Sequence, residues 1–156
     1  MKRILIGIGV LVALGVGICL VRELLTTERQ RVERAVRRLA RRLEARDAMG
    51  LCQLLAEDYQ DANGFDRLSL RALLTRGLPQ LSRVSVRLDG LEVEVTGDDA
   101  TAEFTGSVTA EGRDQGAQPP WRHESLVRLS LRKAEGEWRV RHAEYALPPI
   151  VRREAF

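Results

Sequence analysis

Histidines and carboxylates are the side chains in this sequence best suited to acid–base chemistry. The chain has two histidines, His123 and His142, and a carboxylate within hydrogen-bond distance of either one would form a general acid–base pair. Asp58 lies near the end of a segment with a helical pattern, and it is the carboxylate that we consider for this pairing. The alternative is that both histidines are structural or lie at the rim of a domain, and we favour that interpretation.

Metal, phosphate and thiol chemistry find less support. The two histidines are nineteen residues apart and no cysteine pair accompanies them, so they form no recognisable zinc site. Four oxygen-bearing side chains lack the spacing of a calcium loop: Asp58, Asp61, Asn63 and Asp66. The sequence has no glycine-rich phosphate loop. We therefore expect no metal and no cofactor, and we interpret Cys52 as a small buried apolar residue.

The histidines lie in segments where side chains alternate between two faces. In the segment from Trp121 to Lys133 every second residue shares a face, namely Trp121, His123, Ser125, Val127, Leu129 and Leu131. In the last strand, from Glu137 to Tyr145, the shared face holds Trp138, Val140, His142 and Glu144. Both histidines are therefore expected on an inward face, with a hairpin at Ala134–Gly136 between their strands.

Helical periodicity comes first along the chain and strand periodicity follows it. Apolar residues recur at steps of three and four over residues 28–47, 48–59 and 67–81, which predicts three helices, the third capped by Asp66. After Ser82 the period changes to two. A change of phase at Asp89–Gly90 indicates either a hairpin turn or a bulge in one bent strand. Three helices followed by four or five strands predict an α+β fold, with the helices packed on a curved antiparallel sheet.

An uncharged apolar run, Ile4 to Val21, precedes the helices. Its length is just sufficient for a bilayer-spanning helix, which needs about 17–25 residues. A cleaved signal peptide is the alternative, but the run is longer than the roughly 7–15 residues of a signal core, and no small-residue cleavage motif follows it. We therefore predict a transmembrane anchor over residues 1–25, a domain over 26–147 and a loose tail over 148–156.

Basic residues on both sides of the anchor leave its orientation open. Lys2 and Arg3 favour a cytoplasmic N-terminus, whereas the arginines after the anchor favour a cytoplasmic domain. We favour the first, which places the domain outside the cytoplasm, on the inner membrane of a bacterium. The first helix also offers a basic face for an anionic lipid surface, with the candidates Arg31, Arg34, Arg38, Arg41 and Arg42. The alternative is an ordinary solvated helix face.

The charge balance argues against nucleic acid as a partner. The sequence carries 25 basic and 22 acidic residues, and Lys2 and Arg3 precede the apolar run. The rest of the chain has an excess of one positive charge, far from the strongly basic surface that nucleic-acid binding needs. With 44% hydrophobic and 30% charged residues, the chain has the composition of a folded domain.

In three stretches the chain resembles the nuclear transport factor 2-like superfamily, which includes ketosteroid isomerases and polyketide cyclases. They are the first helix leading into Asp47–Tyr59, the third helix before a bent strand, and the closing segment Gly136–His142. The resemblance implies a cone-shaped domain with a pocket between helices and sheet. The residues expected to line that pocket are Tyr59, Phe104, Trp121, His123, Trp138 and His142.

Isomerase chemistry in this superfamily uses a carboxylate base and a donor pair of tyrosine and protonated acid. The first helix here has no tyrosine and the inward strand positions have no aspartate, whereas a dehydratase-like pair of a histidine with Asp58 stays open. The layout of one membrane helix before such a domain is similar to the inner-membrane assembly component of type IV secretion systems. We therefore expect a membrane-anchored, non-catalytic interaction or assembly module that binds itself or another protein, with a small-molecule-binding or cyclase/dehydratase-like protein as the alternative.

Overall fold

The computed structural model describes residues 27–113 and 120–146. A helix over residues 27–44, termed the long helix, comes first. It is followed by α2 (Ala48–Gln53), β1 (Leu55–Asp61), α3 (Arg67–Gly77), the 3-10 turn η1 (Leu78–Gln80), β2 (Leu81–Thr96), β3 (Asp99–Gly112), β4 (Trp121–Ala134) and β5 (Glu137–Glu144). Among these residues no helix is long and apolar enough to cross a membrane. The predicted anchor over 1–25 and the tail over 148–156 lie outside the described residues.

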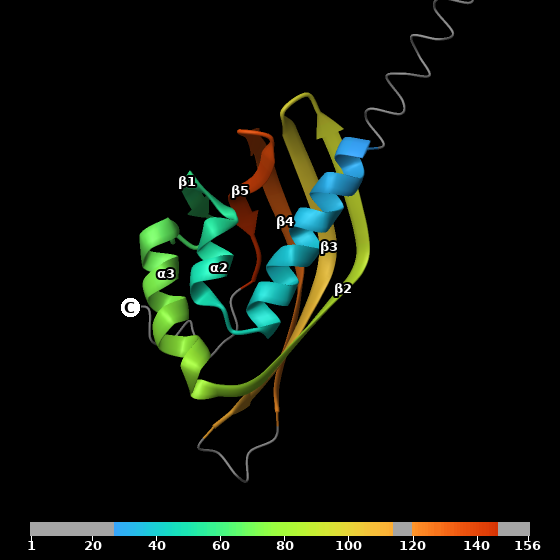
Figure 1. The fold of residues 1–156 in the computed structure, drawn as a ribbon. Coiled ribbons are helices and arrows are strands. Elements are labelled where there is room, and N and C mark those ends of the chain that lie inside the picture. Colours follow the sequence, from blue (N-terminus) through green and yellow to red (C-terminus); the bar gives the residue numbers. More distant parts are fainter. Residues whose placement is uncertain (1–26, 114–119, 147–156) are drawn as a thin grey trace, which may run out of the picture.

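Five strands form one sheet in the order β1-β5-β4-β3-β2, and the helices lie on one of its faces (Figure 1). The pairs β2–β3, β3–β4 and β4–β5 are antiparallel, whereas β1 runs parallel to β5. The predicted α+β layout is therefore confirmed, but the sheet is mixed and not wholly antiparallel. We call the side covered by the helices the inner face and the opposite side the outer face.

The segment predicted as a second helix, residues 48–59, is divided between a helix and a strand. Helix α2 ends at Gln53, and β1 then pairs with β5, with Leu55 opposite Val140. The helical prediction is wrong beyond residue 53 because Leu55 and Tyr59 are four residues apart, a step that fits one face of either a helix or a strand. Pairing with the distant strand β5 makes the segment a strand and not a helix. In this strand Leu55, Tyr59 and Asp61 are all buried.

Strand β2 is one long, bent strand, which is the second of the two alternatives predicted at Asp89–Gly90. Its pairing with β3 passes from Asp89 opposite Thr105 to Glu92 opposite Glu103, so β2 contains one extra residue there. Gly90 has a φ of 66°, a left-handed conformation that glycine adopts without a steric penalty. The bulge bends the strand and returns the apolar residues after it to the inner face.

The core lies between the long helix and the inner face of the sheet. Val32 and Val36 lie one turn apart on the long helix and are almost fully buried. They pack in one cluster with Phe104, Leu131 and other inner-face residues of the sheet. Helix α3 is capped by Asp66, as predicted, and the Asp66 side chain accepts from the Ser69 backbone in a capping box. The helix ends at Gly77, earlier than the predicted residue 81, because the chain continues as the 3-10 turn η1.

Candidate functional site

Two of the predicted pocket residues on the sheet, Phe104 and Trp138, belong to the packed core. Their exposed fractions are 7% and 6%. The Trp138 indole also donates a hydrogen bond of 2.9 Å to the Glu28 carboxylate, which ties the last strand to the long helix. Phe104 and Trp138 are therefore core residues that hold the sheet and the long helix together.

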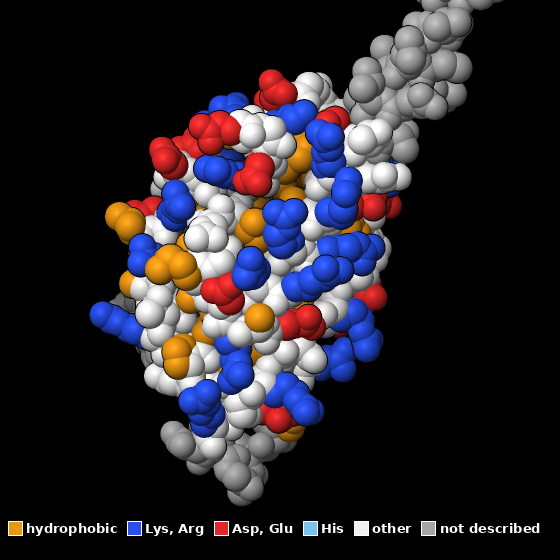
Figure 2. Space-filling view, in the orientation of Figure 1, with side chains coloured by type: hydrophobic (Ala, Val, Ile, Leu, Met, Phe, Trp, Pro, Cys, Tyr) orange, Lys and Arg blue, Asp and Glu red, His pale blue; other side chains and the backbone are white. Residues whose placement is uncertain are grey.

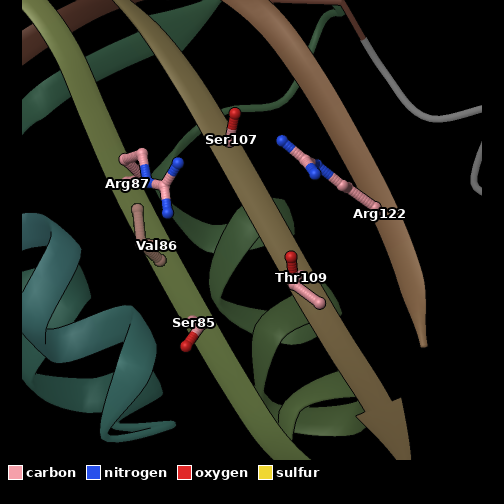
Figure 3. A pocket seen from close by; sticks show the side chains of 6 residues that line it. All are labelled: Ser85, Val86, Arg87, Ser107, Thr109 and Arg122. Carbon is pink, nitrogen blue, oxygen red and sulfur yellow. The ribbon is translucent and has the colours of Figure 1, made fainter.

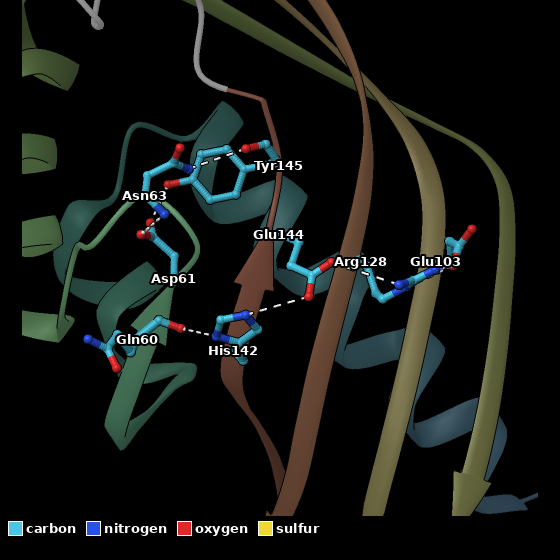
Figure 4. A network of polar contacts seen from close by, with 8 residues as sticks. All are labelled: Gln60, Asp61, Asn63, Glu103, Arg128, His142, Glu144 and Tyr145. Carbon is cyan, nitrogen blue, oxygen red and sulfur yellow. Dashed lines mark hydrogen bonds and ion pairs between the residues drawn. The ribbon is translucent and has the colours of Figure 1, made fainter.

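Tyr59 is buried on β1, where sequence analysis placed a helix. Two residues later, the carboxylate of Asp61 is also buried and accepts three hydrogen bonds: from the Tyr145 hydroxyl at 2.6 Å, and from the backbone N–H groups of Asn63 and Phe65. Figure 4 shows this cluster where β1 meets the end of β5. Burial, and the charge of Asp61, raise the pKa of both Tyr59 and Tyr145, so the phenols stay protonated.

Sequence analysis did not single out Asp61 or Tyr145 as site residues. Asp61 was considered only as one of four oxygen-bearing side chains without the spacing of a calcium loop, and Tyr145 only as the end of the last strand. A carboxylate in an alternating apolar segment is a signal for a buried, hydrogen-bonded group, but that signal needs the strand assignment of β1, which depends on β5.

Trp121 and His123 lie on the inner face at the start of β4, as predicted. Their rings stack with centroids 5.7 Å apart, and both are half-buried. The Nε2 atom of His123 lies 2.8 Å from the Ala146 carbonyl oxygen, so this ring nitrogen is the donor. His123 thus contacts the residue that follows Tyr145, and the Asp61 cluster and the stacked rings are joined through residues 145–146.

His142 is not on the buried face with Trp138 and Val140. In the pairing of β5 with β4, Val140 lies opposite Leu131 and His142 lies opposite Ser130, which leaves Arg141 as an extra residue. This bulge reverses the alternation, so Ala143 is buried and His142 is half-exposed. Its Nδ1 atom lies 2.6 Å from the Gln60 carbonyl oxygen of β1.

Asp58 pairs with neither histidine. Its carboxylate lies 2.7 Å from the Arg141 guanidinium, on the exposed surface of β1. The acid–base pair considered from the sequence is therefore replaced by an ion pair and by two histidine contacts with backbone carbonyls.

The described residues contain no group of three or more His, Cys, Asp or Glu side chains that could hold a metal ion. Cys52 is a buried free thiol, and burial raises its pKa, although the nearby Arg71 and Arg67 reduce the effect. A protonated, buried thiol is a poor nucleophile.

The outer face carries a hollow of about 210 Å³ that sequence analysis missed. Figure 3 shows Arg87 of β2 and Arg122 of β4 on either side of Ser107 of β3. Ser85, Thr109 and Val86 complete the lining. The alternation of β2, β3 and β4 does place these polar residues on one face, but only the strand order brings them together.

The electrostatics of the hollow favour an anion. Arg87 forms no ion pair with another described residue, and the Arg122 guanidinium lies 3.7 Å from Glu124, a weak exposed pair. Glu124 accepts a hydrogen bond of 2.8 Å from the Ser107 hydroxyl. With two guanidinium groups, one carboxylate and further hydroxyls, the hollow has an excess of positive charge and donors suited to a carboxylate or phosphate.

Two other arginines of the outer face, Arg128 and Arg132, are neutralised by ion pairs. Arg128 lies 2.9 Å from Glu103 and 3.8 Å from Glu144, and Arg132 lies 3.1 Å from Asp99. Figure 4 shows the first of these networks, which continues from Glu144 to His142. Arg128 and Arg132 are therefore compensated, whereas Arg87 at the hollow has no ion pair with another described residue and Arg122 has only a weak one.

The five arginines predicted for a membrane surface all lie on the exposed side of the long helix, and Figure 2 shows basic side chains gathered there. The structure divides them into two groups. Arg31 pairs with Glu28 at 2.8 Å and Arg42 pairs with Asp47 at 2.6 Å. Arg34, Arg38 and Arg41 form no ion pair among the described residues, and neither does Arg37, which the prediction omitted.

Comparison with known proteins identifies the fold. No protein-family model and no curated protein matches the sequence. A nuclear transport factor 2-like protein with a cystatin-like fold from Novosphingobium aromaticivorans is 23% identical, with a TM-score of 0.65 over 88% of this chain and 95% of its own. A nuclear transport factor 2-like superfamily protein from Salmonella enterica is 21% identical, with a TM-score of 0.65 over 79% and 92%.

A third solved structure, a protein from Novosphingobium aromaticivorans provisionally assigned as a scytalone dehydratase, gives a TM-score of 0.71. It is 16% identical and the match covers 77% of this chain and 83% of its own. Identities this low show a shared fold and carry no activity with them. The helices on one face of a mixed, bent sheet are therefore the nuclear transport factor 2-like fold that the sequence resembles.

Proposed function

We propose that this chain is a membrane-anchored, non-catalytic binding module whose nuclear transport factor 2-like domain takes part in an assembly of the bacterial envelope, such as a secretion-type complex. The partner is a protein, and the outer-face hollow receives an acidic group from it. The anchor is the apolar run over residues 4–21.

A non-catalytic role is supported by how the candidate acid–base groups are used. His123 and His142 contact backbone carbonyls, and Asp58 pairs with Arg141. Asp61 is buried, but its carboxylate already accepts three hydrogen bonds that hold a turn and Tyr145. A general base needs a free lone pair directed at a substrate, and these groups have structural partners instead.

The observation that carries the binding role is the pair of arginines at the hollow. Arg87 and Arg122 come from strands on opposite sides of β3, and their guanidinium groups flank Ser107 (Figure 3). Arginine binds carboxylates through two parallel donors, and it is enriched where protein interfaces have their strongest contacts. Leu126, two residues after Glu124 on the same face of β4, is 60% exposed and adds apolar area to that face.

Site-specific photo-crosslinking tests this role. A photoreactive residue at position 126 of the full chain, expressed in its own cells, is expected to give a discrete protein adduct. Changing both Arg87 and Arg122 to Gln should abolish the adduct. Arg132→Gln, which alters an arginine already paired with Asp99 on the same face, should leave it in place. Absence of an adduct from position 126, or an adduct unaffected by the double change, would contradict the proposal.

Small-molecule binding is the second candidate function. It is favoured by the half-buried stack of Trp121 and His123, which contacts Ala146 next to the cluster of Asp61 and Tyr145. One of the structural neighbours carries a dehydratase assignment. Native mass spectrometry of the purified chain should reveal a retained ligand that is lost in Trp121→Ala. Identical spectra for both proteins would remove this candidate.

A further inference from the structure

The long helix carries a stripe of four arginines, Arg34, Arg37, Arg38 and Arg41. They are spaced at i, i+3, i+4 and i+7, and therefore lie on one face of the helix. All four are exposed, while Val32 and Val36 are buried on the opposite side. Within residues 27–113 and 120–146 none of the four forms an ion pair. Four adjacent guanidinium groups without a counter-charge repel one another, so a negatively charged partner would relieve an unfavourable arrangement.

Helix α3 adds apolar side chains to the same layer. It contains three arginines and no carboxylate, and none of its residues is buried. Leu68 is 73% exposed, Leu73 is 38% exposed, and Met49 of α2 is 51% exposed. Figure 2 shows hydrophobic side chains over α3 and basic ones over the long helix on one face of the molecule. We call this surface the helical face.

We propose that the helical face lies on an anionic membrane surface, with the arginine stripe against lipid headgroups and the exposed residues of α2 and α3 in the interface. This inference rests on the membrane anchor of the proposed function. It also gives the domain an orientation, because the outer face with its hollow would then point away from the bilayer toward a partner.

The length of the connecting chain suits this arrangement. Five residues, 22–26, separate Val21, the end of the apolar run, from residue 27, where the described helix begins, so six Cα-to-Cα steps connect the two. Even fully extended they reach only about 20 Å. The electrostatic attraction between basic groups and an anionic surface extends over a Debye length of about 8 Å. A short tether keeps the helical face at a high effective concentration near the membrane surface. Each arginine at such a surface shifts the balance between bound and free domain about fivefold.

Two features favour lipid over an acidic protein. The mixture of arginines with separate exposed leucines and a methionine is typical of surfaces that bind at the headgroup boundary. The exposed apolar residues lie on α2 and α3, in the same layer of helices as the arginine stripe (Figure 1). A protein segment on the stripe alone would leave them in water, whereas a bilayer surface would extend over the whole layer.

Lipid-headgroup quenching tests the orientation in the full chain. Ala45 lies near the end of the long helix, on the side of the stripe, about 27 Å along the axis from residue 27. A fluorophore is attached to the cysteine of an Ala45→Cys variant that also carries Cys19→Ser. Its fluorescence is measured in vesicles that contain lipids with nitroxide-labelled headgroups. We expect strong quenching in vesicles of phosphatidylcholine with phosphatidylglycerol, and little in phosphatidylcholine alone. A fluorophore at Leu126→Cys, on the outer face, is the matched control and should stay unquenched in both.

The arginines are then tested as a group. Changing Arg34, Arg37, Arg38 and Arg41 to Gln should reduce quenching at position 45 to the level of neutral vesicles, whereas Lys at the same four positions should retain it. Circular dichroism of each variant checks the fold. Equal quenching in both lipids, or quenching unaffected by the Gln variant, would overturn the proposal. Lack of quenching combined with a protein adduct from position 45 in native membranes would assign the helical face to a protein instead.

Failure here is distinguishable from failure of the proposed function. If the full chain is removed from membranes by alkaline carbonate, the anchor itself is wrong. If the chain stays in the membrane and position 126 still gives its adduct, but position 45 is unquenched, only the orientation is wrong.

Discussion

At the residue scale, the hydrogen bond between Tyr145 and Asp61 joins the end of β5 to β1. Tyr145→Phe leaves a buried carboxylate with one donor fewer, so we expect a loss of about 1.5–3 kcal/mol in the free energy of unfolding. Thermal unfolding of the detergent-solubilised full chain, followed by tryptophan fluorescence, measures it. Tyr59→Phe is the matched control, because the Tyr59 hydroxyl makes no hydrogen bond to another described residue. Equal losses in the two variants would argue against a specific role for the bond.

Glu28 gives the fold a pH dependence. Burial alone would raise the pKa of Glu28, but hydrogen bonds from Trp138 and Lys133 and the charge of Arg31 together lower it. The folded pKa is thus below the unfolded value of about 4.3. The stabilisation is present above that value and is lost as the pH falls through the folded pKa. When the pH is lowered from about 6 to about 3, the free energy of unfolding of the Glu28→Gln variant should fall less than that of the unaltered chain. Equal decreases in the two proteins would contradict this.

At the scale of elements, β-bulges decide which face of the sheet the following side chains occupy. The bulge in β2 depends on Gly90. An alanine there must keep a φ of 66°, which costs about 1 kcal/mol or more. Gly77, at the end of α3, has an ordinary helical backbone and open space around it. Gly77→Ala should therefore stabilise by about 0.4–1 kcal/mol. Unfolding curves of the two variants should shift in opposite directions, and shifts of the same sign would show that the bulge does not need a glycine.

The sequence predicts helices and strands well where one hydrophobic period continues along a segment. It predicts them poorly where pairing with a distant strand decides the structure. The long helix, the Asp66 cap and strands β3 to β5 follow from local spacing. Strand β1 does not follow from local spacing, because the four-residue step from Leu55 to Tyr59 fits one face of a helix or of a strand. Only the pairing with β5 makes the segment a strand. His142 was assigned to the inner face for a related reason: the extra residue Arg141 in β5 is visible only in the register with β4. Predicting the hollow would require the order of β2, β3 and β4 in the sheet, and no local sequence pattern gives that order.

At the scale of the whole molecule, charge is divided between the two layers. Residues 27–53 carry eight arginines and four carboxylates, and α3 adds three arginines and no carboxylate. The described part of strands β2–β5 and their connections has nine basic and eleven acidic residues. The helical layer is thus the cationic side, and on the outer face Arg87 has no ion pair with another described residue and Arg122 has only a weak one. This division supports two separate binding surfaces, one for lipid and one for an acidic group.

The central claim is that the outer-face hollow binds an acidic group. A fluorescent, glutamate-rich peptide is titrated against the full chain in nanodiscs of neutral lipid, with Arg34, Arg37, Arg38 and Arg41 changed to Gln so that the helical face does not compete. We predict saturable binding, weakened about tenfold or more by Arg87→Gln with Arg122→Gln, and unchanged by Arg132→Gln. Equal affinity in all three proteins would contradict the account.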